Sequence, residues 1–456
     1  MFKLELSFNE ILEAIDGKVL VKNKTDFNRV CIDTRKIEEN NIYVAIKGEN
    51  FNGNKFVIEA FSKGASIAII DEVLFEENDN SNLGTIIKVK NSEKALLDLA
   101  KYYREKLALK VVGVTGSCGK TSTKDLIAAL LSEKYKVFKT KGNFNNQIGL
   151  PLMILELDST IDVAVLEMGM SDLGEIDILA NCARPDIAVI TNIGLSHIEN
   201  LKTQDNILKA KSEIFNYFNE NNTLVINGED KHLLKIKNKC FDILKIGYNH
   251  EYDVNAYNII LREDNTSFSI EENGYEYNFN LPMPGKHNVL NCMLAIAVAK
   301  TLKVEFSDMI KGINNLEATS MRLEIIKNKK YTLINDCYNA SPDSMKSSLD
   351  VLNTYRDKRK VAILGTMNEL GDESIKLHTE VGQYAKDKVD LLIAIGKYKE
   401  FYKKGYSKEN IVVFDTKEEF LNLKETIIKE NDIILIKASR GIKFEEIVKS
   451  LEAEEI

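Results

Sequence analysis

Residues 110–121, with the sequence KVVGVTGSCGKT, hold an apolar, β-branched run that passes directly into a glycine-rich turn. A helical pattern starts at Lys120, so the turn joins a predicted strand to a predicted helix. Such a turn directs backbone N–H groups and a helix N-terminus at phosphate oxygens. We therefore expect Lys120 to meet the β- and γ-phosphates of a nucleotide and the Thr121 hydroxyl to bind Mg²⁺.

This turn departs from the standard phosphate-loop pattern by one position. The standard pattern has glycine where this chain has Val114, and the match is GxxGxxGKT. A coincidental glycine turn is the alternative, but the flanking strand and helix favour a phosphate loop. Cys118 stands before the predicted helix, where a thiol either has a lowered pKa or is simply a tolerated small residue.

Strands and helices alternate along the whole chain in three sections. At about 150 residues per domain, 456 residues correspond to about three domains. Residues 1–107 predict a small α/β domain. Residues 108–317 predict a central phosphate-loop domain, with a parallel sheet covered on both faces, added antiparallel strands and a helix after Gly285. Residues 318–456 predict a second doubly wound sheet, a Rossmann-like domain.

The composition argues against several classes of protein. With 61 basic and 69 acidic side chains, the net charge of -8 argues against nucleic-acid binding through a general basic field. Acidic residues interrupt the N-terminus where a signal peptide needs an apolar stretch, and no segment approaches the roughly 18 apolar residues of a membrane-spanning helix. The six cysteines form no CxxC pair, which is typical of thiols in a reducing cytosol. We expect a cytoplasmic monomer without membrane insertion or a nucleic-acid partner.

The variant loop resembles that of the Mur ligase family, ATP-dependent enzymes that form amide bonds and whose loop has the form TGxxGKT. Further segments match the family in order along the chain. They are residues 141–152 (KGNFNNQIGLPL), 166–169 (LEMG), 191–197 (TNIGLSH) and 209–213 (KAKSE). The resemblance covers nearly the whole chain and implies ATP and Mg²⁺ as cofactors.

Three C-terminal segments are similar to one branch of this family. They are residues 335–345 (NDCYNASPDSM), 364–371 (LGTMNELG) and 437–441 (KASRG). That branch joins D-alanyl-D-alanine to UDP-N-acetylmuramoyl-tripeptide, so the resemblance implies both as partners, with the UDP-sugar on the first section, ATP on the second and the dipeptide on the third. Two alternatives remain. One is a ligase that adds a diamino acid to UDP-N-acetylmuramoyl-dipeptide, and the other is a non-catalytic ATP-binding switch. The sequence leaves open whether position three of the peptide is L-lysine or diaminopimelate.

The resemblance assigns the chemistry to a small set of side chains. It implies that Lys120 contacts the ATP phosphates, that Glu167 and His197 bind Mg²⁺ together with Thr121, and that Lys211 is carbamylated and so becomes an anionic metal ligand. Glu167 ends a predicted parallel strand, where open α/β sheets bind their ligands, although a surface or helix-capping glutamate is the alternative. From residue type alone, His197 is more simply a structural histidine and Lys211 a solvated charge.

The remaining candidates are expected to bind ATP or the substrates. The expected ATP-binding residues are Thr115, Gly116, Ser117, Cys118, Gly119, Lys120, Thr121, Asn288, Arg322 and Asp336. The expected substrate-binding residues are Thr34, Arg35, Lys47, Asn143, Asn145, Asn146, Asn339 and Arg440. Only nine of the 61 basic residues are arginines, and an arginine suits bidentate binding of phosphate or carboxylate. The asparagines fit an ordinary polar loop equally well.

Two segments depart from the family pattern. Asn52-Gly53-Asn54 stands where the family usually has an Asp-Gly-His step, which leaves the nucleotide-sugar contacts there open. Ser341 replaces the commoner asparagine before Pro342. We expect Ser341 to cap a helix that has Pro342 at its first position.

Overall fold

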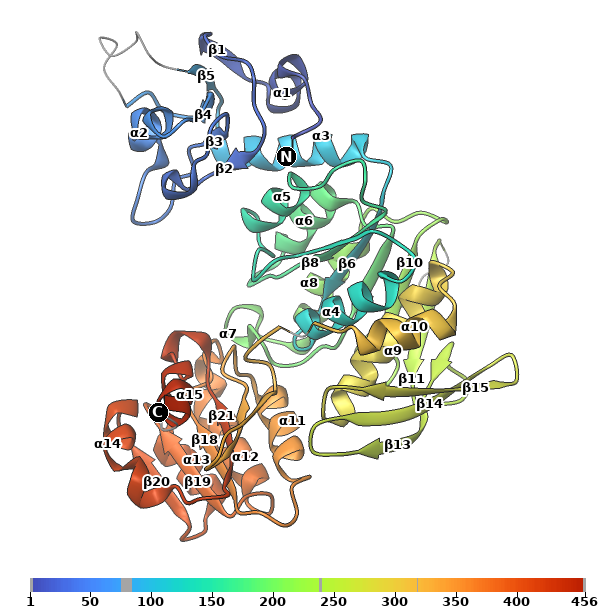
Figure 1. Cartoon of the computed structure of the whole chain (residues 1–456), viewed down its shortest axis with the longest axis vertical. Coiled ribbons are helices and arrows are strands. Elements are labelled where there is room, and N and C mark those ends of the chain that lie inside the picture. Colours follow the sequence, from blue (N-terminus) through green and yellow to red (C-terminus); the bar gives the residue numbers. More distant parts are fainter. Residues whose placement is uncertain (1–2, 75–83, 238–239, 318, 454–456) are drawn as a thin grey trace.

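The computed structural model describes residues 3–74, 84–237, 240–317 and 319–453 (Figure 1). Three parts follow one another along the long axis of the molecule in Figure 1. The N-terminal part (blue) lies at one end, the largest part (green to yellow) in the middle, and the C-terminal part (orange to red) at the other end.

The N-terminal part contains a sheet with the strand order β1-β5-β4-β3-β2, parallel except where β1 meets β5. The apolar strand β4 is buried along its whole length, as a strand inside a covered sheet must be. The strands are β1 (Lys18–Val21), β2 (Val30–Cys31), β3 (Ile42–Val44), β4 (Ile67–Ile70) and β5 (Thr85–Lys88). The helices are α1 (Phe8–Ile15), α2 (Val57–Ser62) and α3 (Ser92–Lys106).

The middle part is built on a parallel sheet with the order β12-β11-β10-β9-β6-β8-β7. The chain moves from β6 to one side of the sheet through β7 and β8, and then to the other side from β9 onward. The carboxyl ends of β6 and β9 therefore meet at a switch point, where α/β sheets bind ligands. The strands are β6 (Lys110–Thr115), β7 (Val137–Lys139), β8 (Val163–Glu167), β9 (Ile187–Ile190), β10 (Thr223–Asn227), β11 (Asp242–Gly247) and β12 (Val254–Asn255). The helices are α4 (Lys120–Leu131), α5 (Gly149–Ile154), α6 (Glu175–Ala183), α7 (Ile198–Leu201), α8 (Gln204–Ser212), α9 (Lys286–Thr301) and α10 (Phe306–Asn314).

Helix α9 joins the parallel sheet to a small antiparallel sheet of β13 (Tyr257–Leu261), β14 (Thr266–Glu272) and β15 (Tyr275–Leu281). It contacts α4, β10, β11 and β14, so most of its residues from Asn288 to Ala299 are buried. A helix enclosed on all sides needs apolar residues around its whole circumference, and α9 has them.

The C-terminal part has the strand order β16-β17-β21-β18-β19-β20, with β16 antiparallel to β17 and the other pairs parallel. The strands are β16 (Glu324–Lys327), β17 (Thr332–Asn335), β18 (Lys360–Leu364), β19 (Leu391–Ile395), β20 (Ile411–Phe414) and β21 (Ile433–Lys437). The helices are α11 (Pro342–Leu352), α12 (Ser374–Ala385), α13 (Lys399–Tyr406), α14 (Lys417–Ile427) and α15 (Glu445–Glu452). Ser341 caps α11 and Pro342 is its first residue, as predicted.

Buried charged side chains tie the parts to one another. Arg104 at the end of α3 donates from Nε to the Ala183 carbonyl oxygen at 3.0 Å and pairs with Asp186 at 3.3 Å, so α3 is held against the middle part. In α4, Asp125 accepts hydrogen bonds from the backbone N–H and the hydroxyl of Thr319, at 3.2 and 2.7 Å. The helix that follows the phosphate loop therefore also holds the start of the C-terminal part.

The predicted fold class is confirmed. The parallel sheets, the added antiparallel strands and the helix after Gly285 occur where the sequence indicated them. The domain boundaries at residues 107 and 317 stay predictions. The thiols of Cys31, Cys118, Cys182, Cys292 and Cys337 form no disulfide bonds. Within the described ranges, no helix is both long and apolar enough to cross a bilayer.

Gly312 allows α10 to lie close against α4, the helix that begins with Lys120. A Cβ atom at this position would be 2.3 Å from the Ala129 carbonyl oxygen. We expect Gly312→Val to push the two helices apart and to lower stability by about 1–3 kcal/mol, as overpacking does. Unfolding in guanidinium measures the loss. The control is Lys311→Val, in the same helix with its side chain 64% exposed, and an equal loss in both variants would contradict the packing argument.

Candidate active site

A cavity of about 610 Å³ opens at the carboxyl ends of β6, β8 and β9 and is closed on its far side by the C-terminal part. Most of the predicted site residues line it. They are Ser117, Cys118, Gly119, Lys120, Thr121, Asn143, Asn145, Asn146, Glu167, His197, Asn288, Arg322, Asp336, Asn339 and Arg440. Segments more than 300 residues apart in the sequence thus form one site.

The phosphate loop passes so close to its neighbours that it has no room for side chains at two positions. Gly116 has a φ of 150°, and a Cβ there would lie 1.8 Å from the Thr191 hydroxyl oxygen. Gly119 has a φ of 81°, and its Cβ would lie 2.7 Å from Asn291 Oδ1. Both conformations suit glycine alone. The Cys118 backbone N–H donates to Asn192 Oδ1 at 3.0 Å, which braces the loop on the segment after β9.

Thr121 and Asn145 both donate to the carboxylate of Glu167, although the three residues come from separate segments. Thr121 Oγ1 donates to Glu167 Oε2 and Asn145 Nδ2 donates to Glu167 Oε1, each at 2.9 Å. Glu167 is only 3% exposed. A buried carboxylate needs such donors, and these two hold it at the first turn of α4. The predicted neighbourhood of Thr121 and Glu167 therefore forms.

Two lysines lie close together near the phosphate loop. Lys120 Nζ donates to the Gly116 carbonyl oxygen at 2.8 Å, and burial lowers the pKa of Lys120 below its ordinary value. Lys211 is 1% exposed and is not among the described residues that line the cavity. Burial, and then the charge of Lys120, lower the pKa of Lys211 well below 10.5. The reading of Lys211 as a solvated surface charge is therefore wrong, because α8 directs it inward.

His197 lies at the start of α7 and lines the cavity. Its backbone has a φ of 62°, a conformation that residues with a Cβ seldom adopt. Its Nδ1 is 2.7 Å from Glu369 Oε2, which belongs to the C-terminal part. Nε2 is then the ring nitrogen that remains for a ligand.

The side chains of Thr121 and Glu167 form a suitable partial site for Mg²⁺. The ion prefers oxygen ligands, usually keeps several waters, and is held by one or two carboxylates together with substrate phosphates. Thr121 and Glu167 supply a hydroxyl and a carboxylate directly beside the phosphate loop. Across the described residues, no cluster of three or more His, Cys, Asp or Glu could hold a metal unaided. A magnesium ion at this position would have the nucleotide phosphates and water available as further ligands.

Helix α9 contributes two amides at its N-terminal end. The predicted Asn288 is 2% exposed, and its Nδ2 donates to the Pro284 carbonyl oxygen at 2.8 Å. Its Oδ1 accepts from Asn291 Nδ2 at 3.0 Å. Asn291 then contacts the phosphate loop at Gly119, a role that the sequence analysis missed although Asn291 lies one turn after Asn288.

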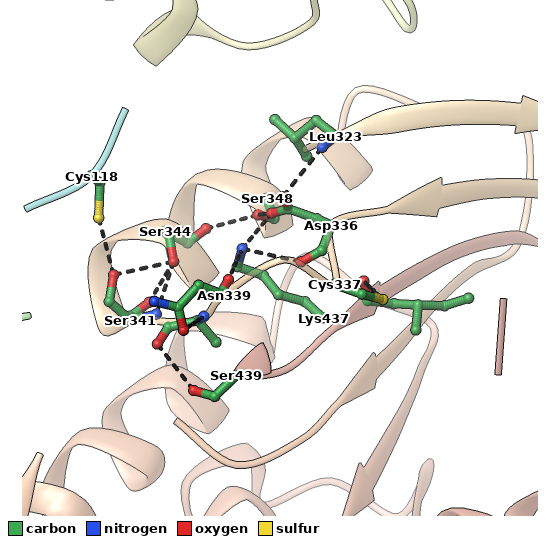
Figure 2. A network of polar contacts seen from close by, with 12 residues as sticks. Cys118, Leu323, Asp336, Cys337, Asn339, Ser341, Ser344, Ser348, Lys437 and Ser439 are labelled. Atoms are coloured by element: carbon green, nitrogen blue, oxygen red, sulfur yellow. Dashed lines mark hydrogen bonds and ion pairs between the residues drawn. The ribbon is translucent and has the colours of Figure 1, made fainter. Parts of the chain in front are cut away.

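The C-terminal part closes the cavity with a network of polar contacts around Asp336 (Figure 2). Asp336 Oδ1 accepts from the Leu323 backbone N–H at 3.2 Å, and Oδ2 accepts from the Ser348 hydroxyl at 2.6 Å and from Lys437. The predicted ribose acceptor is thus held firmly in place. Its Oδ2 already has two donors, whereas Oδ1 has one, so Oδ1 has capacity for a ligand hydroxyl.

Figure 2 also shows Cys118 meeting the start of α11, with its Sγ 3.1 Å from the Ser341 hydroxyl oxygen. The phosphate loop and the C-terminal part therefore touch at this point. Asn339 also lines the cavity on the side of the C-terminal part. Its carbonyl oxygen accepts from Lys437 Nζ at 3.0 Å, and its Oδ1 accepts from the Ala340 N–H at 2.9 Å.

Tyr338 lies beside both predicted arginines of the C-terminal part. The Arg322 guanidinium carbon is 4.1 Å from the centre of the Tyr338 ring, and that of Arg440 is 5.9 Å away. Stacking on an aromatic face orients a guanidinium without neutralising it. Arg440 also pairs with Glu445 at 3.2 Å. Sequence reasoning missed Tyr338, although the residue lies within the 335–345 motif.

The asparagine segment has both structural and exposed amides. Asn146 Oδ1 accepts from the Gly149 N–H at 2.8 Å and so supports the start of α5. Asn143 and Asn146 line the cavity beside Asn145. Asn146 therefore supports the local turn, and Asn145 is tied to Glu167, while substrate binding by this segment stays a prediction.

The candidates in the N-terminal part are Thr34, Arg35 and Lys47. None of the three is among the described residues that line the cavity. Thr34 donates to Glu59 at 3.0 Å, Arg35 bonds to Asp33 with its side chain 83% exposed, and Lys47 pairs with Glu72 at 2.6 Å. Their role in binding the substrate stays a prediction. In the divergent Asn52-Gly53-Asn54 step, Asn54 is 1% exposed and donates to Asp71 at 2.7 Å, so that residue stabilises a turn.

The fold and this cavity define a phosphate-loop nucleotide-binding protein with a second α/β sheet closing over the nucleotide site. The family profile of the Mur ligase middle domain matches residues 114–299, and that of the Mur ligase glutamate ligase domain matches residues 321–440. The chain belongs to the Mur ligase family.

Similar proteins extend over almost the full chain. The UDP-N-acetylmuramoyl-tripeptide–D-alanyl-D-alanine ligase of Bacillus subtilis (strain 168) is 40% identical over 435 residues, which cover 94% of each chain. A crystal structure of MurF from Acinetobacter baumannii is 29% identical, with a TM-score of 0.89 and 98% of each chain covered. The MurF ligase from Thermotoga maritima in complex with ADP is 30% identical, with a TM-score of 0.82 and 93% of this chain and 97% of that chain covered.

The buried Lys211 predicts a specific dependence of stability on pH. The unfolded chain keeps a proton on this lysine up to about its ordinary pKa of 10.5, whereas the folded chain loses it at lower pH. In that interval the unfolded state binds more protons, so wild-type stability rises with pH. Lys211→Met lacks this contribution. We expect the stability advantage of Lys211→Met over wild type to shrink as the pH rises toward 10.5.

Guanidinium unfolding in carbonate-free buffer at several pH values measures this difference. The matched control is Lys209→Met, which changes an exposed lysine on the same helix and should leave the pH dependence unaltered. Parallel pH profiles for Lys211→Met and wild type would contradict the effect of burial on Lys211.

Proposed function

We propose that the chain is an ATP-dependent ligase that joins D-alanyl-D-alanine to UDP-N-acetylmuramoyl-tripeptide. The observation that carries the proposal is the 40% identity with the Bacillus subtilis ligase of that name over 94% of both chains. The products are UDP-N-acetylmuramoyl-pentapeptide, ADP and phosphate, as peptidoglycan precursor synthesis requires.

The reaction needs ATP because a carboxylate is a poor acylating agent, its leaving group being oxide. The tripeptide carboxylate attacks the γ-phosphorus of ATP and forms an acyl phosphate with release of ADP. The amine of the dipeptide then attacks the carbonyl carbon, phosphate leaves with the carbon–oxygen bond electrons, and the amine gives up a proton. Both first reactants are anions, so the site must provide positive charge and alignment.

Lys120 is suited to bind the phosphates. It now donates to the Gly116 carbonyl oxygen, a neutral acceptor in its own loop. Phosphate oxygens are stronger acceptors because they are charged, and they also favour the protonated lysine against the burial that lowers its pKa. Mg²⁺ held by Thr121, Glu167, His197 and a carbamylated Lys211 would neutralise phosphate charge during the transfer.

Each part of the chain has its own ligand in this proposal. Residues 1–107 bind the UDP-sugar through Thr34, Arg35 and Lys47, residues 108–317 bind ATP, and residues 318–456 bind the dipeptide. In the third part, Arg322 and Asp336 reach ATP, and Asn339 and Arg440 serve the peptide substrates. The contacts of Cys118 with Ser341 and of His197 with Glu369 support this arrangement, because they hold the third part against the nucleotide site. Such closure excludes water that would hydrolyse the acyl phosphate.

Phosphate release with purified substrates tests the proposed reaction. We expect release only when ATP, a UDP-N-acetylmuramoyl-tripeptide and D-alanyl-D-alanine are all present, and the lysine and diaminopimelate forms of the tripeptide are compared in separate reactions. Lys120→Met is the control for contaminating ATPases. Equal turnover with the dipeptide precursor and a free diamino acid would overturn the proposal in favour of the other ligase. Nucleotide binding without amide formation would indicate a switch protein.

Chemical rescue tests the proposed carbamylation of Lys211. We expect Lys211→Ala to lose most activity because the anionic ligand is gone, and to regain part of it with added short carboxylates such as acetate. The initial rate of phosphate release is measured with and without the additive, and Lys209→Ala serves as the control. Normal activity of Lys211→Ala without any added carboxylate would show that no anionic ligand is needed there.

A further inference from the structure

The motif at residues 364–371 follows β18 and brings an acidic side chain to the reaction site from the C-terminal part. Glu369 lines the cavity, and its Oε2 lies 2.7 Å from His197 Nδ1 in the middle part. The Glu199 backbone N–H also donates to the Glu369 carbonyl oxygen at 3.2 Å. Two hydrogen bonds thus join this loop to the segment around His197.

The backbone conformation shows that both residues of the pair are held by their surroundings. His197 has a φ of 62° and Glu369 a φ of 64°, in the left-handed region that residues with a Cβ seldom adopt. Uncommon conformations of this kind persist where neighbouring contacts determine them, and they cluster at functional sites. The facing pair therefore differs from a surface ion pair between mobile side chains.

The carboxylate determines which nitrogen of His197 carries the proton. An ionised carboxylate only accepts hydrogen bonds, so His197 Nδ1 must donate. In the neutral ring the Nε2 lone pair then remains available to a ligand in the cavity. Without Glu369 the ring would rotate and exchange between tautomers, and a histidine that binds a metal usually depends on such an outer partner.

We propose that Glu369 is a positioning residue that fixes the tautomer and orientation of His197, and does so only while the C-terminal part is docked. This inference rests on the proposed function. It makes the nucleotide site fully competent only when the part that brings the dipeptide is in place. Before the C-terminal part docks, the site is incompletely assembled and transfers the phosphoryl group poorly. Transfer of this group to water, which would waste ATP, is therefore limited.

Nuclear magnetic resonance of the protein labelled with ¹⁵N-histidine tests the tautomer directly, without substrates or metal. The chain has five histidines. The variant His197→Gln identifies the signal of His197, because that signal is lost from its spectrum. In alkaline buffer, at about pH 8.5, we expect the ring hydrogen of His197 to lie on Nδ1 in the wild type. Glu369→Ala should shift the population toward Nε2 protonation, and Glu369→Gln should have a smaller effect because its amide oxygen still accepts.

The matched control is Glu373→Ala, which removes another carboxylate two residues beyond the 364–371 motif. Glu373 is half exposed and pairs with Lys376 at 2.8 Å. It should leave the His197 signal and the activity unchanged. A wild-type His197 protonated on Nε2, or a tautomer unaffected by Glu369→Ala, would overturn the proposal.

A double-mutant cycle tests the consequence for catalysis. We expect Glu369→Ala to lower kcat by about 10- to 100-fold, the usual range for loss of an outer-shell partner, with little change in KM for the tripeptide. The double variant Glu369→Ala/His197→Ala should be no slower than His197→Ala, because the two residues act as one unit. Mn²⁺ affinity in the ADP complex should fall in Glu369→Ala and not in Glu373→Ala.

The outcomes separate this inference from the proposed function. Additive losses in the cycle, or an unchanged Mn²⁺ affinity in Glu369→Ala, would refute the positioning role while the wild-type enzyme still makes the amide. A wild-type protein that makes no amide would refute the proposed function, whereas the tautomer measurement would still stand. Thermal melting of each variant shows whether a loss comes from unfolding.

Discussion

The close packing around the phosphate loop is the constraint on which the rest of the site depends. Gly116 lies against Thr191 and Gly119 against Asn291, with no space for a Cβ at either position. The loop can take this shape only if the segment after β9 and the start of α9 occupy their observed positions. Because α9 is in turn enclosed by α4, the parallel sheet and β14, the nucleotide site and the middle core form together.

The charged groups of this site come from parts of the chain that lie far apart in the sequence. Two lysines, Lys120 and Lys211, are brought together in a region of low solvent access, and the pKa of each falls as a result. Glu167 and the C-terminal Glu369 provide nearby negative charge. Binding of anionic phosphates would favour the protonated form of Lys120, so the energy of the folded site is linked to its ligand.

The fold class and much of the cavity could be predicted from local patterns. Apolar β-branched runs indicated the strands, and the loop spacing identified Lys120 and Thr121, since both signals arise within a few neighbouring residues. Lys211 was assigned through the family resemblance, because a lysine on a short helix carries no local sign of burial. Asn291, Tyr338 and Glu369 were missed for a related reason: each acts on a partner from another segment. Thr34, Arg35 and Lys47 stay predictions, as they lie away from this cavity.

By itself the sequence determined the order of strands and helices and the chemistry of the phosphate loop, because hydrophobic periodicity and glycine conformations are local properties. It contained Glu369 and His197 as separate residues, without any sign that they meet. Their hydrogen bond depends on how the C-terminal sheet docks on the middle part, which many weak contacts along the chain decide jointly. The tautomer of His197 and the burial of Lys211 are therefore properties of the assembled structure.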